Sequence, residues 1–229
     1  MGKTNLVNEI KQAINNSLGD LVTEAYVTQP KKFDLRTELL SDATKEAMAE
    51  SFDASVAALN RTSAALDGAD RDTANNRASD FRSLKLDEVH NMNASFLKAL
   101  YFENISDLDS RITMDTLAFL RLERDFGTFD EWQRDFIACC MSSRDGYAVT
   151  GYSTFLKRYI NFVIDEQSNN VGVGAHPVIV LDVSASAYYR DYNNNRKAYV
   201  MAMMRELNWA KIETRFKRAE KIAKALVEK

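Results

Sequence analysis

The stretch of sequence that decides the fold is DVSASAYYRDYNNNR, residues 182–196 of the 229-residue chain. It directly follows residues 178–181, a continuous apolar run of the kind that forms buried strands. After it the pattern is helical, with apolar side chains repeating on one face at Trp209, Ile212, Phe216, Ile222 and Leu226. The stretch therefore predicts a junction at which a buried strand ends near Asp182 and helices begin.

Strand-forming residues dominate the segment before this junction. The region from Tyr147 to Ile164 is rich in Tyr, Thr, Val, Phe and Ile, which favour a pleated surface. Together with residues 178–181 it predicts three strands. Upstream, residues 113–124 and 128–141 predict two helices, with Gly127 ending the first and Thr128 capping the second.

The first half of the chain is predicted to be a helical hairpin. Ser41 is a candidate N-cap for a long helix over residues 42–66. A second helix is expected from about residue 86 to residue 102. The residues between them are polar and turn-prone, which allows the two helices to run side by side in opposite directions.

An amphipathic arm precedes the hairpin. Its apolar residues draw one stripe down a helix and are Leu6, Ile10, Ile14, Leu18 and Leu21. Pro30 marks its end, because the residue before a proline is pushed toward extended geometry. The stripe must be buried on the chain's own domain or on a neighbouring protein. We favour the neighbour and assign these five residues as candidate partner-binding residues.

Four short motifs carry a resemblance to a known family. Residues 182–196 resemble the signature D-V-W-E-H-A-Y-Y-x-D-Y-x-N-x-R of the iron/manganese superoxide dismutases, and Asn208-Trp209 resembles the N-W that follows it. Residues 126–129 (Phe-Gly-Thr-Phe) resemble F-G-S-F, and residues 93–96 (Asn-Ala-Ser-Phe) resemble N-H-[ST]-F. Order and spacing agree with the family over roughly residues 33–216. We interpret the matching residues Tyr188, Tyr189, Tyr192, Asn194 and Arg196 as contacts that hold the sheet to the C-terminal helices rather than as catalytic residues.

The resemblance implies an α+β fold. An N-terminal helical hairpin domain is followed by a mixed domain with a three-stranded antiparallel sheet and flanking helices. We therefore divide the chain into the arm (residues 1–29), the hairpin domain (30–110), the C-terminal α/β domain (111–216) and a basic helical extension (217–229).

The resemblance also implies a metal site of three imidazoles and one carboxylate, most of which this chain lacks. The ligand positions correspond to Asp182, Ser186, Ala94 and, near the start of the first hairpin helix, Ala47. The whole chain contains two histidines, so three imidazoles are excluded within one chain. We expect no iron or manganese, no other cofactor and no catalytic residue, and we interpret Asp182 as an N-cap rather than as a ligand.

The two histidines raise the alternative of a rebuilt site. His90 lies four residues before Ala94, where iron-type relatives place a glutamine, and Gln167 lies near the equivalent in manganese-type relatives. His176 is expected in the turn before Pro177, too far away to join them. We favour His90 as a hydrogen-bonded side chain that fills the old cavity.

Composition argues against several other classes. With 30 basic and 33 acidic residues the net charge is -3, which gives no general attraction for nucleic acid. No apolar stretch has the length of a membrane span or the pattern of a signal peptide. Cys139 and Cys140 lie in an apolar stretch without a C-x-x-C motif and are predicted to be buried, reduced thiols.

These observations favour a non-enzymatic structural subunit of a larger assembly. Metal-less relatives of this fold are known in mitochondrial ribosomes and in tailed-phage virions, and residues 1–30 mix acids with bases unlike an import signal. We expect a phage tail or baseplate protein, in the virion or the host cytoplasm, with other protein subunits as partners. The alternatives are an active dismutase with an atypical metal site and an RNA-binding ribosomal subunit. The family's dimer bridge falls on Ala185 and Ser186, so a homodimer would rest on packing alone.

Overall fold

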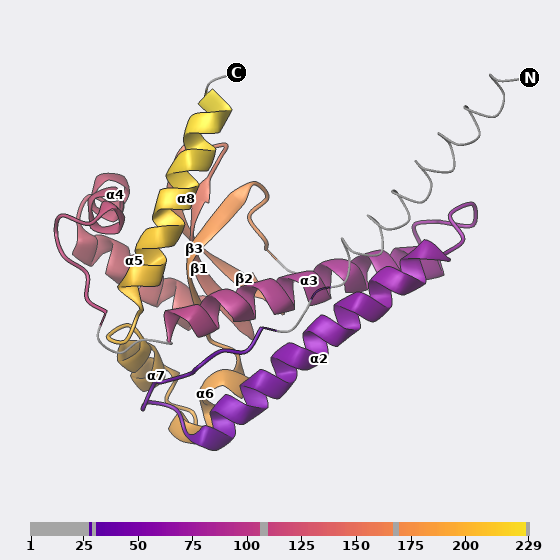
Figure 1. Ribbon diagram of the computed structural model, residues 1–229, viewed down its shortest axis with the longest axis horizontal. Helices are drawn as coiled ribbons and strands as arrows, with labels where there is room; N and C mark the ends of the chain where they lie inside the picture. Colours follow the sequence, from indigo (N-terminus) through magenta and orange to yellow (C-terminus); the bar gives the residue numbers. More distant parts are fainter. Residues whose placement is uncertain (1–27, 29–30, 106–109, 167–169, 228–229) are drawn as a thin grey trace, which may run out of the picture.

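The computed structural model describes residue 28 and residues 31–105, 110–166 and 170–227. The elements in chain order are α2 (Asp42–Asp67), α3 (Asp80–Asn104), α4 (Leu117–Phe126), α5 (Phe129–Ser142), β1 (Gly146–Ser153), β2 (Arg158–Asp165), β3 (Ala175–Asp182), α6 (Ala185–Tyr192), α7 (Arg196–Met203) and α8 (Trp209–Val227). Figure 1 shows a helical hairpin followed by a sheet with helices around it. The predicted α+β architecture is confirmed.

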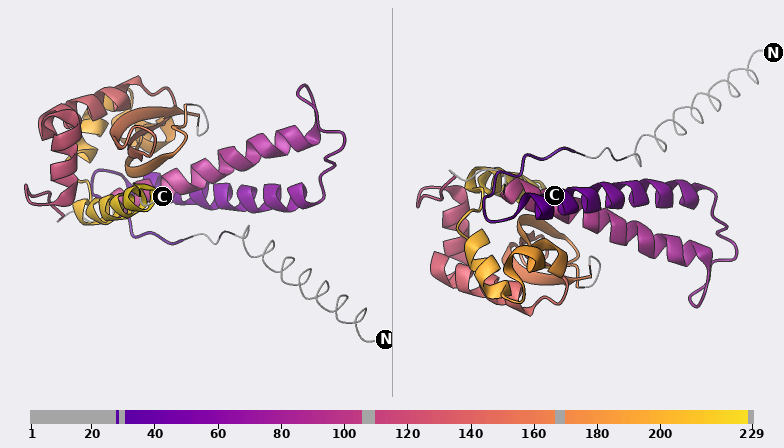
Figure 2. Two further views of the ribbon diagram at one scale, coloured as in Figure 1. Left: turned by 90° about the horizontal axis from the view of Figure 1, so that it is seen from above. Right: turned by 90° about the horizontal axis from the view of Figure 1, so that it is seen from below.

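The hairpin α2–α3 protrudes from the rest of the molecule. Figure 2 shows the two helices running side by side toward the connecting turn, while the sheet and the remaining helices gather at the other end. At that end α3 packs against β3 and α8, and α2 packs against α6. The base of the hairpin therefore meets the junction between the last strand and the following helix.

Hydroxyl side chains fix where four of the helices begin. Ser41, Ser79, Thr116 and Thr128 each accept a hydrogen bond from the backbone N–H three residues further on. Ser41 and Thr128 confirm the predicted caps. Gly127 ends α4 with a φ of 93°, a left-handed conformation that favours glycine.

Two predicted helix starts are wrong. Helix α3 begins at Asp80 rather than near residue 86, because Ser79 caps it before the first buried side chain appears. Helix α4 begins at Leu117 rather than at Thr113, because Thr113 lies in a turn and its carbonyl accepts the N–H of Thr116. In both cases the cap rather than the apolar pattern sets the boundary.

The sheet has the order β2-β1-β3, with both pairings antiparallel. Strand β1 is central and all eight of its residues are buried, as expected for a strand covered on both faces. Tyr147 lies opposite Ile164 on one side and opposite Asp182 on the other. This register places the end of β3 beside the start of the buried central strand.

His176 and Pro177 lie in β3, so the prediction of a turn at this point is wrong. Strand β3 is at the edge of the sheet, where a proline can dispense with a ladder hydrogen bond. The pairing with β1 also shifts between Thr150 and Gly151, the residue opposite Pro177.

One continuous hydrophobic core joins the hairpin to the sheet. It runs from Phe52 and Phe102 at the base of the hairpin, through Trp132 and Tyr159, to Phe216 on α8. The rings of Tyr159 and Phe216 stack with centroids 4.5 Å apart. The hairpin and the α/β part therefore share a single buried interior.

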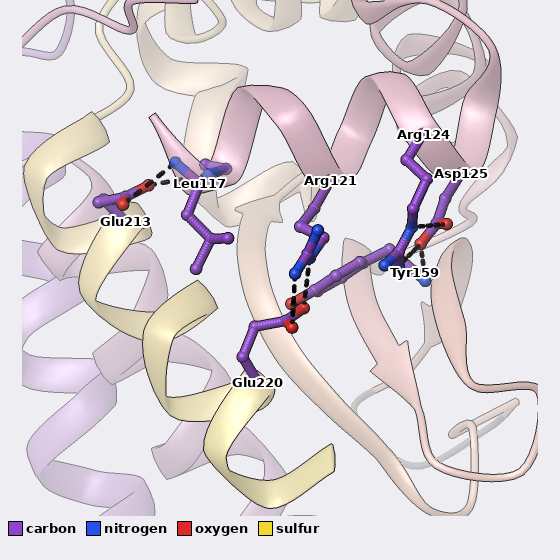
Figure 3. Close-up of polar contacts among 8 residues, drawn as sticks. Leu117, Arg121, Arg124, Asp125, Tyr159, Glu213 and Glu220 are labelled. Carbon is purple, nitrogen blue, oxygen red and sulfur yellow. Dashed lines mark hydrogen bonds and ion pairs between the residues drawn. The ribbon is translucent and has the colours of Figure 1, made fainter. Parts of the chain in front are cut away.

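Polar contacts tie α8 to α4 beyond the core, as Figure 3 shows. Glu213 accepts hydrogen bonds from the backbone N–H groups of Leu117 and Ala118, at 3.2 and 2.8 Å, at the start of α4. One turn along, Arg121 forms a two-bond ion pair with Glu220, at 2.8 and 3.0 Å.

The proposed boundary at residues 216 and 217 falls inside α8, which is one uninterrupted helix.

Among the helices that the structure describes, none combines the length and the apolarity that a membrane span requires. The predicted arm and its stripe, Leu6, Ile10, Ile14, Leu18 and Leu21, lie outside the described residues.

Candidate functional site at the end of strand β3

The four predicted ligand positions lie on elements that pack together. Asp182 is the last residue of β3, Ser186 lies in the first turn of α6, and Ala47 lies near the start of α2, which is beside α6 in Figure 1. Ala47 and Ser186 line one surface pocket. Ala94 is buried on α3, the helix that packs against β3. The four positions therefore lie on elements that pack against one another near the end of β3.

Asp182 is 1% exposed and its two carboxylate oxygens differ in their partners. Oδ1 accepts the backbone N–H of Ser184 at 2.9 Å and the hydroxyl of Ser184 at 2.6 Å. Oδ2 is buried and has no hydrogen-bond partner in the described structure. Burial raises the pKa of Asp182, and the charge of Lys98 and the bonds from Ser184 oppose that shift.

The interpretation of Asp182 as an N-cap is wrong. The N-cap of α6 is Ser184, and Asp182 lies two residues earlier, in β3. A different carboxylate serves the start of the helix, because Asp145 Oδ1 accepts the N–H of Ala185 at 3.0 Å. The carboxylate of Asp182 instead fixes the residue that begins the helix.

Lys98 is the site residue that sequence reasoning missed. It lies one helical turn after Ala94 on α3, is 5% exposed, and donates from Nζ to Ser51 Oγ at 3.1 Å. Ser51 lies one turn after Ala47 on α2. The available signal was spacing, since Lys98 occupies the same face of α3 as the buried Ala94 and Tyr101.

A chain of phenols holds the backbone beneath this site. Tyr199 donates from its hydroxyl to the backbone carbonyl of Asp182 at 2.6 Å, and the hydroxyls of Tyr101 and Tyr199 are 3.0 Å apart. Both side chains are fully buried, and burial raises the pKa of each, so both hydroxyls keep their protons at neutral pH. Their arrangement is a structural anchor for the end of β3.

The residues after Asp182 that match the family signature divide into two groups. Tyr188 stacks on Tyr199 with ring centroids 5.3 Å apart, and Tyr192 donates to the carbonyl of Leu39 at 3.1 Å. These contacts agree with the predicted role in keeping the fold, as does the bond from Arg196 to Tyr188. Tyr189 is 52% exposed and Asn194 is also exposed, so the prediction is wrong for these two side chains.

Neither histidine lies at one of the four ligand positions. His90 is exposed on α3, so the prediction that it fills an old cavity is wrong. His176 is half-buried in β3, and burial lowers its pKa. Gln167 lies outside the described residues. Throughout the part of the chain with described coordinates, no three His, Cys, Asp or Glu side chains gather closely enough to hold a metal ion.

The prediction of buried thiols is confirmed for Cys140 and holds only in part for Cys139. Cys140 is fully buried, and Cys139 is partly buried with its pKa raised by burial to about 11. A thiol with a raised pKa is a poor nucleophile and a poor metal ligand, since the thiolate is the reactive form.

The residues at the four ligand positions do not fit iron or manganese. Two of them, Ala47 and Ala94, present methyl groups, which donate no electron pair. Ser186 offers a neutral, exposed hydroxyl, so Asp182 is the single carboxylate in the set. The ammonium of Lys98 adds a positive charge that would repel a metal cation.

A protruding helical hairpin, a three-stranded antiparallel sheet and a strand-to-helix junction with a buried carboxylate together define a two-part α+β protein. The family model for the C-terminal domain of iron/manganese superoxide dismutases matches residues 117–215. The iron superoxide dismutase of Aquifex pyrophilus is 32% identical over 158 residues, which span 69% of this chain and 73% of that protein. Superoxide dismutase [Mn] 2 of Haloferax volcanii is 29% identical over 131 residues, 57% of this chain and 65% of that protein. The chain belongs to the iron/manganese superoxide dismutase family.

Proposed function

We propose that this chain is a metal-free, non-enzymatic member of its family that acts as a structural subunit of a larger assembly. The observation that supports the proposal is the set of side chains around Asp182. Two methyl groups and a hydroxyl stand where a redox metal needs three imidazole ligands, and a positively charged ammonium lies nearby. Without a metal that alternates between two oxidation states, the family's dismutation of superoxide has no electron carrier.

Exposed apolar side chains support a role in protein contacts. Helix α3 carries four of them at helical spacing on the protruding hairpin: Leu86, Val89, Met92 and Phe96, each between 43% and 54% exposed. Their spacing places the four side chains along one face of α3, and exposed apolar patches mark contact sites between proteins. The arm of residues 1–29, with its own apolar stripe, is the second candidate contact element.

As the more specific proposal, the assembly is a tailed-phage virion, with the chain in the tail or baseplate. Its support is the resemblance to metal-less relatives of this fold, together with the net charge of -3, which does not favour RNA. We expect mass spectrometry of purified virions of the phage that encodes this chain to find the chain at a fixed copy number. Its absence from particles would refute this assignment.

The experiment that tests the loss of enzymatic function is elemental analysis combined with a superoxide assay. The chain would be expressed in medium supplied with iron and manganese, and the Aquifex pyrophilus enzyme would be purified in parallel as a positive control. We expect metal far below one ion per chain and no turnover above the buffer rate. One iron or manganese per chain with turnover would establish the alternative, an active dismutase with an atypical site. Salt-sensitive binding to RNA would favour the ribosomal alternative.

A further inference from the structure

An apolar groove of about 310 Å³ lies between the two helices of the protruding hairpin. Its apolar lining is formed by the side chains of Phe52, Val56, Leu59, Met92, Phe96 and Ala99. Met92 and Phe96 belong to the four exposed apolar residues of α3 named above, which continue the rim of the groove toward the hairpin turn. A groove of this kind is the type of site into which an amphipathic helix packs.

The groove also contains a buried hydroxyl that has no hydrogen-bond partner among the described residues. Ser95 lines the groove and is 6% exposed, and its Oγ bonds to no described atom. A buried hydroxyl without a partner costs free energy, which a polar side chain of an occupant would recover. The part of the chain that the structure describes therefore leaves the groove incomplete.

The apolar stripe of the arm matches this groove in length and in chemistry. A helix rises by about 22 Å between Leu6 and Leu21. The apolar face of α3 between Leu86 and Ala99 is about 20 Å long. The stripe consists of five aliphatic side chains on one side of a helix, and these fit a groove that is lined by aliphatic and aromatic side chains.

Two contacts fix the chain where the arm joins the hairpin. Lys31 forms an ion pair of 2.8 Å with Glu103 in the last turn of α3, at the base of the hairpin. The backbone N–H of Thr28 donates to Asn60 Oδ1, and Asn60 Nδ2 donates to the carbonyl of Thr28, each at 2.9 Å. Asn60 lies in the half of α2 that is nearer the hairpin turn. Followed back from Lys31 to Thr28, the chain therefore runs from the base of the hairpin toward the turn.

This direction leaves little of the chain's own hairpin for the arm. Beyond Asn60, α2 continues to Asp67, seven residues or about 10 Å further. The stripe needs about 22 Å, so a helix that continues in this direction passes the end of the hairpin. The stripe would reach its own groove by a reversal of the chain within residues 22–27, whereas the groove of a second copy requires no reversal.

We propose that the arm of one copy binds the hairpin groove of a second copy, so that the chain assembles with itself. The inference rests on the proposed structural role and names the neighbour in that proposal as another molecule of this chain. The arm and the exposed face of α3, which are the two candidate contact elements, thereby form the two sides of one interface. Burial of the five aliphatic side chains together with Met92 and Phe96 supplies the driving force.

The first test is the mass of the full chain in solution, measured by sedimentation equilibrium over a range of concentrations. We expect a mass above that of the monomer in the micromolar range. Ile14→Asp in the arm and Phe96→Asp in the groove should each weaken the association by at least roughly thirtyfold, because each places a charge at the centre of an apolar contact. The matched control is Phe155→Asp, at an exposed phenylalanine between β1 and β2, which should associate like the natural chain.

A natural chain that stays monomeric up to about 100 μM would overturn the proposal. The arm would then fold against its own hairpin or bind a different protein.

A mixture of the two variants separates exchange between copies from docking within one chain. The Ile14→Asp variant keeps an intact groove, and the Phe96→Asp variant keeps an intact arm. An equimolar mixture should therefore form a complex with one copy of each, while each variant alone stays monomeric. Absence of this complex would overturn the proposal. Met92→Asp takes the place of Phe96→Asp in both tests if circular dichroism shows that Phe96→Asp does not fold.

The outcomes separate the inference from the function on which it rests. Stoichiometric metal with turnover in the natural chain would refute the non-enzymatic role. A metal-free chain that is present in virions at a fixed copy number, but is monomeric when purified, would refute the inference alone.

Discussion

Arg215 is the buried charge whose removal we expect to cost the fold most. It lies on α8, is 4% exposed, and joins three elements through its guanidinium. Nη1 donates to Asn104 Oδ1 at 2.6 Å and to the carbonyl of Val178 at 3.2 Å. Nη2 donates to the carbonyl of Leu100 at 2.8 Å and to Glu103 Oε2 at 3.0 Å. The residue thereby fixes α8 to the end of α3 and to β3, the strand that carries Asp182.

Arg215→Met keeps the aliphatic stem and removes all four bonds. The four hydrogen bonds contribute about 1 kcal/mol each, or about 4 kcal/mol together, and we add about 1 kcal/mol for a buried acceptor that is left without a donor, which gives about 4–5 kcal/mol. Removal of Nε, which is buried without a partner, returns about 1 kcal/mol. The expected net loss is about 3–4 kcal/mol, a large share of the roughly 5–15 kcal/mol that holds a domain folded.

The assay is equilibrium unfolding in urea, followed by the fluorescence of the buried Trp132 and Trp209. The matched control is Arg218→Met on the same helix, because Arg218 is exposed. We expect the midpoint of Arg215→Met to fall well below that of the control, with an unchanged slope. A difference between the two of less than about 1 kcal/mol would show that the network adds no net stability.

Three further predictions concern a strand, a thiol and an ion pair. Gly146→Ala would place a Cβ 2.0 Å from the backbone oxygen of Ile164, so the β1–β2 pairing must open. We expect the free energy of unfolding in urea to fall by about 3 kcal/mol, and an unchanged midpoint would contradict this. Because its pKa is about 11, Cys139 should react with a disulfide reagent at pH 8 roughly a hundredfold more slowly than free cysteine. A rate equal to that of free cysteine would refute this prediction. The hydrogen-bonded ion pair with Arg121 lowers the pKa of Glu220. Its stabilisation is therefore present above the unfolded pKa of about 4.3 and is lost as the pH falls through the lower folded value. Glu220→Gln should cost about 1 kcal/mol or less at neutral pH and flatten the decline in stability between about pH 5 and pH 3, whereas a parallel decline would argue against the pair.

The fold was predictable because its signals are local. Thr128 and Gly127 mark helix ends by their own chemistry, and the apolar run before Asp182 marks a buried strand without reference to any other part of the chain. The start of α3 was not predictable from apolar spacing, because its first turns lie on the protruding part of the hairpin and bury few side chains. There the cap at Ser79 sets the boundary.

The sequence positions of the candidate site could be assigned from the sequence, but the contacts among its side chains could not. The ligand positions were assigned from the order of the motifs along the chain, and in the structure Ala47 and Ser186 line one pocket. The role of Lys98 depends on Ser51 of another helix, 47 positions away, and no spacing along one helix shows that contact. The exposure of His90 likewise depends on which face of α3 packs against the sheet, which requires the tertiary structure.

The hydroxyl of Tyr199 donates its hydrogen bond to the backbone carbonyl of residue 182 rather than to the side chain. Every amino acid has a backbone carbonyl, so this hydrogen bond does not depend on which side chains occupy the neighbouring ligand positions. A fold that is held by hydrogen bonds to its backbone can lose metal ligands one residue at a time and still form the same structure.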